Sequence, residues 1–364
     1  MWGVKRLVFR AVLLFSLLLK PSFQIGIETC FEVVTEGEGA CSAADIQLLN
    51  VFYNDAVALL RAGISIYDNY KSPNVGTFSH LISWANGQAF FGLRPQRDAN
   101  EDITNIPEEG GRWDTVRKIL SRTQRFLAGE EDILNINTKP YIYCRDWWIE
   151  RVPDINAPKL KEGIPPSNPN PGGLESPPTS ILNAYRSYLF ENGVRNTKEV
   201  WWNKINREYY VQSPMPEGTL GMTWKGDGTE STKPRTVLTD RVFREYGRRL
   251  VASHSDVTAM TGINTYYTGA ATLVHEIIHL TAEGQDNDHF YGFGDIVVRN
   301  QQLLTRLDQG DRTALQEFYE LQYTADAYAW YCLSAYLSSV SGMTLFFATG
   351  AGLNAEQWDD IPAA

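Results

Sequence analysis

A short apolar segment that carries two histidines and a glutamate constrains the fold of this chain more than any other feature. Residues 272–281 read TLVHEIIHLT, with His275 and His279 four residues apart and Glu276 directly after the first histidine. The apolar residues around them predict a helix buried in the core. Residues four apart lie one turn apart on the same helix face, so both imidazoles can reach one ion. This HExxH pattern is typical of a zinc site in which the glutamate is a general base.

Two histidines leave such a site incomplete, because catalytic zinc usually takes three protein ligands and keeps one position open. Glu283 follows His279 by one turn, but it lies about 12 Å along the helix axis from His275 at 1.5 Å per residue. Glu283 is therefore too far from His275 to bind the same ion. Gly284 is a good helix terminator, so the third ligand is expected from the returning loop or from another helix. The candidates are Asp286, Asp288 and His289 in the loop, and Glu317 and Glu320 on the following helix.

The residues after the motif resemble one family of zinc peptidases. Nine residues after its second histidine, HExxH is followed by D-x-x-Y-G, which here is Asp288, Tyr291 and Gly292. This pattern is similar to that of the aspzincins, the deuterolysin and peptidyl-Lys metalloendopeptidase family. Three further segments resemble the family's sequences: ATLVHE at 271–276, TADAYAWYC at 324–332 and, more weakly, KPYIYCRDWW at 139–148. The segment from 144 to 262 is longer than its counterpart in the family.

The resemblance implies how the site is completed. Asp288 is expected to be the third zinc ligand beside His275 and His279. The loop GQDNDHFYG is one residue longer than in the family, which leaves Asp286 as the alternative ligand. Tyr291 is expected to donate its hydroxyl to the oxyanion that forms on the scissile carbonyl.

The resemblance also implies an α+β fold with a zincin-like core, in which a small twisted sheet packs on the HExxH helix. Asp326, on a helix behind that one, is a candidate acceptor for the second ring N–H of a zinc-bound histidine, and a plain surface carboxylate is the alternative.

Residues 25–364 are expected to form a single metallopeptidase domain. The Pro-rich segment at 153–180 is expected to be a long loop, and it and the residues up to about 250 are expected to form an elaboration before the active-site helix. Hydrophobic periodicity predicts the remaining elements. Helices are expected over 44–70, 113–127, 239–252, 266–283 and 312–337, a strand over 139–152 and a hairpin over 217–231.

The N-terminal residues 1–24 read as a signal peptide. Basic residues precede an apolar run of nine residues at 11–19, which is shorter than the roughly 20 needed to span a bilayer. We therefore expect cleavage near residues 22–26, secretion and no stable membrane association; the alternative is a retained signal anchor.

Four cysteines are an even number, and an exported chain meets an oxidising compartment. Cys30 with Cys41 is the favoured pair because it closes a short loop, which leaves Cys144 with Cys332.

Together, these features predict a secreted zinc endopeptidase that acts as a monomer on protein or peptide substrates. The alternatives are a zinc hydrolase of a non-peptide substrate and a secreted binding or effector protein that keeps the site only structurally. A net charge of −10 and a pI near 5.1, without a sizeable basic cluster, argue against a nucleic-acid partner.

Overall fold

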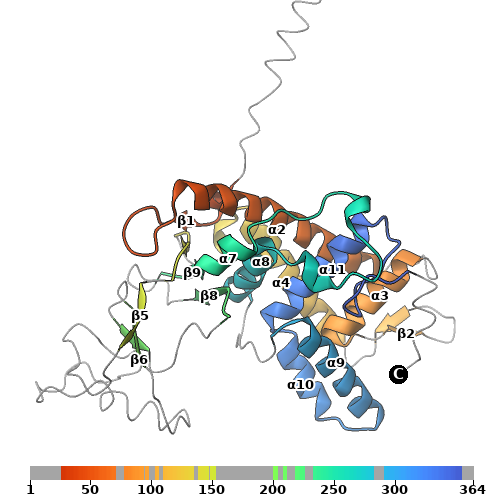
Figure 1. The fold of residues 1–364 in the computed structure, drawn as a ribbon. Helices are drawn as coiled ribbons and strands as arrows, with labels where there is room; N and C mark the ends of the chain where they lie inside the picture. The colour runs from red at the N-terminus through yellow and green to blue at the C-terminus, as the bar shows by residue number, and fades with distance from the viewer. Residues whose placement is uncertain are drawn as a thin grey trace, which may run out of the picture.

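The computed structural model describes most of the chain outside the N-terminal segment and several loops. The described residues are 26–70, 78–93, 95–97, 103–105, 110–134, 138–146, 148–152, 200–203, 208–210, 218–225, 233–282 and 291–354. Within these ranges the chain is α+β, with eight helices and small sheets (Figure 1), so the α+β part of the expected fold class is confirmed. The predicted signal peptide and the Pro-rich loop at 153–180 lie outside the described residues. No described helix is long and apolar enough to cross a membrane.

The helices are α2 (Ala43–Tyr70), α3 (Phe78–Phe91), α4 (Gly110–Leu127), α7 (Asp240–Glu245), α8 (Gly269–Thr281), α9 (Phe293–Asp308), α10 (Ala314–Leu321) and α11 (Ala325–Val340). The strands are β1 (Glu32–Val33), β2 (Pro95–Arg97), β3 (Ile103–Asn105), β4 (Tyr141–Tyr143), β5 (Ile149–Val152), β6 (Val200–Asn203), β7 (Glu208–Tyr210), β8 (Gly221–Trp224) and β9 (Arg235–Leu238).

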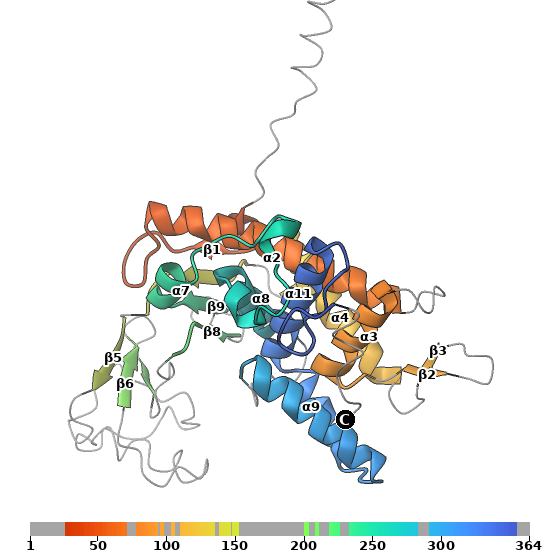
Figure 2. The same cartoon turned by 45° about the vertical axis from the view of Figure 1, so that its right-hand side comes forward.

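The HExxH helix, α8, lies at the centre of the molecule. It packs against α2, α4 and α11 and against the sheet through β8 (Figures 1 and 2). Every residue of α8 except His279 is buried, as the apolar sequence around the motif predicts. Gly269 allows the start of α8 to approach α2 closely, because a Cβ there would lie 2.4 Å from the ring of Phe52.

The main sheet is small and mixed, with strand order β1-β4-β9-β8. The first three strands are parallel, and β8 runs antiparallel to β9 at the edge of the sheet next to α8. A small sheet packed on the HExxH helix is therefore confirmed. The remaining strands form a β2-β3 pair and a β5-β6-β7 sheet, and β5 and β6 stand apart from the helices in both views (Figures 1 and 2).

Four expected elements differ from the structure. The helix expected over 239–252 ends at Glu245. Of the hairpin expected over 217–231, the described residues 218–225 contain β8, which pairs with the later strand β9. The single helix expected over 312–337 is two helices, α10 and α11, with a break at 322–324. The strand expected over 139–152 is also split, into β4 and β5. Helices α3 and α9 have no counterpart among the elements expected from the sequence.

The predicted disulfide pairing is wrong. Cys41 is bonded to Cys144, whereas Cys30 and Cys332 are buried free thiols. The parallel pairing of β1 with β4 explains the difference, because it brings the turn before Cys41 beside the end of β4, where the Cys144 N–H donates to the Gly39 carbonyl at 3.1 Å. Cys332 lies instead on α11, against α2.

Non-reducing peptide mapping should therefore recover a Cys41–Cys144 peptide. Cys41→Ser should lower the free energy of unfolding by about 4 kcal/mol, because the bond closes a loop of about a hundred residues. Burial raises the pKa of the Cys30 and Cys332 thiols, so these two cysteines should be alkylated only after unfolding. Rapid alkylation of either thiol in the native protein would contradict this arrangement.

Candidate metal centre

The two histidines of the motif converge, as their spacing predicts. Their Nε2 atoms are 2.9 Å apart and their ring centroids 4.6 Å apart. Two nitrogen ligands of one tetrahedral zinc ion, each at about 2.0–2.1 Å from it, come about 3.3 Å apart, a little more than this separation. His275 and His279 therefore present two suitable nitrogens to one ion.

Asp326 determines which nitrogen of His275 is left to bind a metal ion. Its Oδ1 lies 2.7 Å from Nδ1 of His275, and its side chain is almost completely buried. A carboxylate oxygen accepts hydrogen bonds, so Nδ1 donates to Asp326 and Nε2 is the nitrogen left to bind a metal ion. This is the arrangement that metal-binding histidines need. The expectation that Asp326 is the partner of a site histidine is confirmed.

The same carboxylate also anchors the chain after the loop. Oδ2 of Asp326 accepts from the Gly292 N–H at 2.6 Å. Gly292 has φ 85° and ψ 153°, a backbone conformation that favours glycine. Asp326 therefore connects His275 to Gly292, the residue that precedes α9. In the sequence, Gly292 follows the loop residues that are predicted to supply the third ligand.

Glu276 lies beside the histidine pair and is hydrogen-bonded to a residue of the sheet. It is 1% exposed, and its Oε2 accepts from the Thr223 hydroxyl of β8 at 2.8 Å. Its Oε1 is 3.9 Å from Nε2 of His275. Thr223 is not among the residues expected from the sequence, because nothing in its spacing from the motif points to this contact.

Tyr291 is close to the site and open to solvent. Its ring stacks on that of His275, with centroids 6.4 Å apart and planes 24° apart, and the residue is 63% exposed. A bound substrate can therefore reach this side chain.

The described residues do not complete the ligand set. Among them, no three His, Cys, Asp or Glu side chains are grouped to hold a metal ion, so Glu317 and Glu320 do not join the histidine pair. The Glu317 carboxylate instead pairs with Arg299 and Arg306. The loop candidates Asp286, Asp288 and His289 lie outside the described residues and stay predictions.

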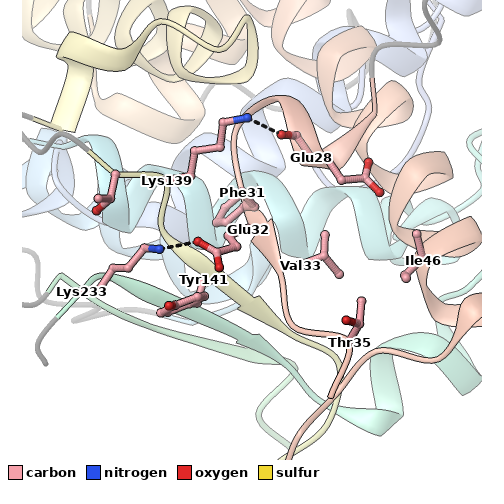
Figure 3. Close-up of a pocket in the computed structure, with 10 residues that line it drawn as sticks. Glu28, Phe31, Glu32, Val33, Thr35, Ile46, Lys139, Tyr141 and Lys233 are labelled. Carbon is pink, nitrogen blue, oxygen red and sulfur yellow. Dashed lines mark hydrogen bonds and ion pairs between the residues drawn. The ribbon is translucent and has the colours of Figure 1, made fainter. Parts of the chain in front are cut away.

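A separate pocket of about 590 Å³ lies around β1, at the opposite edge of the sheet from β8 (Figure 3). Its charged side chains interact with its own walls: the Lys233 ammonium pairs with Glu32 at 2.5 Å, and the Lys139 ammonium donates to the Glu28 carbonyl at 2.6 Å. Neither histidine of the motif lines this pocket, so it is distinct from the metal centre.

Comparisons with protein-family models, curated protein sequences and solved structures find no match to this chain. The assignment of a function therefore depends on the residues of the site.

Asp326→Asn should weaken zinc binding by about 10- to 100-fold, because the amide no longer selects the His275 tautomer that offers Nε2. Competition with a chelating dye measures the affinity. The control is Asp311→Asn, since the Asp311 carboxylate interacts with Arg306 and Thr313. Equal zinc affinity in both variants would show that Asp326 does not support a metal site.

Proposed function

We propose that this chain is a secreted zinc-dependent endopeptidase, and that its core is zincin-like. The observation that carries the proposal is the convergence of two imidazole nitrogens on a buried helix, with Glu276 beside them and Asp326 behind. The aspzincin-like spacing of the residues after the motif supports it. The signal-peptide pattern at 1–24 and the Cys41–Cys144 disulfide support an oxidising, extracellular location.

The proposed zinc ligands are His275, His279 and Asp288, with Asp286 as the alternative to Asp288. The two histidines fit a zinc ion in donor type and spacing. Zinc bound in such a site lowers the pKa of water toward about 7 and polarises a carbonyl group.

Glu276 is the proposed general base. Its carboxylate takes a proton from the attacking water as the new C–O bond forms, and it delivers that proton to the leaving amine as the C–N bond breaks. Its burial against β8 holds the carboxylate in place through both transfers.

Tyr291 is the proposed donor to the oxyanion. Its exposed ring stacks on that of His275, which supports a contact between its hydroxyl and a substrate carbonyl bound at this site. A phenol in this place stabilises negative charge only as that charge develops.

The edge strand β8 supports a peptide as substrate. It packs on α8 and, in the part of the chain that the structure describes, no strand pairs with its outer side. An edge strand offers main-chain N–H and C=O groups to which an extended peptide can add as a further strand.

Zinc content measured together with casein hydrolysis tests this function. Wild type should bind one equivalent of zinc and cleave casein, and Asp288→Ala should lose most of the metal and the activity. His289→Ala and Glu320→Ala should keep both.

Three other results would change the assignment. Full zinc occupancy in Asp288→Ala would make Asp286 the ligand. Zinc without proteolysis would favour a hydrolase of a non-peptide substrate, and neither zinc nor proteolysis would favour a binding or effector protein.

Tyr291→Phe should reduce kcat about a hundredfold with little change in KM, because the lost hydrogen bond acts on the transition state. The ring and its contact with His275 remain, so zinc content and thermal stability should stay at the wild-type level. Hydrolysis at the wild-type rate would show that Tyr291 only packs in the site.

A further inference from the structure

On the side of the candidate metal centre that faces the sheet, Glu276 is hydrogen-bonded to a residue outside the HExxH motif. Thr223 lies on the edge strand β8, and its hydroxyl is 2.8 Å from Oε2 of Glu276. The same hydroxyl is 3.3 Å from the Glu276 carbonyl. A hydroxyl has one proton, and the shorter contact to the charged oxygen takes it.

A second threonine orients that hydroxyl. Thr236 on β9 is directly opposite Thr223 in the strand register, and their hydroxyl oxygens are 3.0 Å apart. Because Thr223 donates to Glu276, it accepts from Thr236, which is completely buried. Both side chains are β-branched and stiff at χ1, so the pair holds the donor in one direction.

A glycine on the same strand leaves room for the other carboxylate oxygen. Gly221 is two residues before Thr223, so the two residues are on the same face of β8. A Cβ at Gly221 would lie 2.5 Å from Oε1 of Glu276. Oε2 is therefore held by Thr223, while Oε1 lies over Gly221 at 3.9 Å from Nε2 of His275.

We propose that Thr223 is the positioning residue for Glu276, and that it directs proton transfer to Oε1. This inference rests on the proposed function. The O–H bond of the attacking water breaks as the Oε1–H bond forms, and the Oε1–H bond then breaks as the N–H bond of the leaving amine forms. Oε2 accepts from the Thr223 hydroxyl throughout, so the proton is taken up on the oxygen that faces the histidines.

Steady-state kinetics of three variants test the role. Thr223→Val removes the hydroxyl with little change in shape, and kcat should fall by about tenfold or more, as expected for a lost hydrogen bond to a charged group. KM and zinc content should stay within about twofold, because substrate and metal contacts remain. Thr223→Ser restores the hydroxyl and should restore kcat to within about threefold. Thr223→Ala makes the same test if the valine variant does not fold.

Thr123→Val is the matched control. Thr123 is a fully buried threonine whose hydroxyl pairs with that of Thr281 at 2.7 Å. The Thr123→Val variant loses one hydrogen bond between two threonines without a change at Glu276. The kcat of this variant should therefore match that of wild type. An equal fall in kcat in Thr123→Val and Thr223→Val would overturn the proposal, because the effect would then come from general destabilisation.

Crystal structures of the zinc-loaded proteins separate this proposal from the proposed function. Wild type and Thr223→Ser should show one orientation of the Glu276 carboxylate, and Thr223→Val should show a rotated or second one. If wild type cleaves no peptide while the carboxylate still moves in Thr223→Val, the function is wrong and the positioning role stands. If wild type is active, and Thr223→Val keeps both its activity and the carboxylate orientation, the positioning role is wrong and the function stands.

Discussion

The burial of a helix that carries two histidines and a glutamate is the constraint on which the rest of this structure depends. A polar group removed from water costs several kcal/mol unless it is hydrogen-bonded, and a charged one costs more. On α8, His275 and Glu276 are both buried, so each needs a partner from another element. Asp326 on α11 supplies one and Thr223 on β8 supplies the other. The helix therefore requires a helix on one side and a strand on the other.

These two partners come from opposite directions along the chain. Thr223 precedes Glu276 by 53 residues, and Asp326 follows His275 by 51 residues. The break between α10 and α11 puts Asp326 in the first turn of its helix, where it also accepts from the Gly292 N–H. Packing of the elements around α8 thus aligns the donors and acceptors of the site before any ligand binds.

The arrangement gives the histidine and the glutamate of the motif separate partners. Asp326 is hydrogen-bonded to Nδ1 of His275, which leaves Nε2 of that ring facing His279. Thr223 holds one oxygen of Glu276, and Gly221 leaves space for the other. The solvent-exposed Tyr291 stacks on His275. These residues come from α8, α11, β8 and the segment just before α9, and they are the parts that the proposed hydrolase requires.

The sequence by itself determined the features that depend on near neighbours in the chain. The buried helix at 269–281 follows from its apolar residues, and the meeting of His275 and His279 follows from their spacing of four residues on that helix. The motif resemblance pointed to Asp326 as a histidine partner. Three features were decided only by the tertiary structure. They are the Cys41–Cys144 disulfide, the hydrogen bond from Thr223 to Glu276 and the division of 312–337 into two helices. The first two depend on strand order and register, which bring together residues far apart in sequence. The third places α10 against α9, whereas α11 packs against α2 and α8.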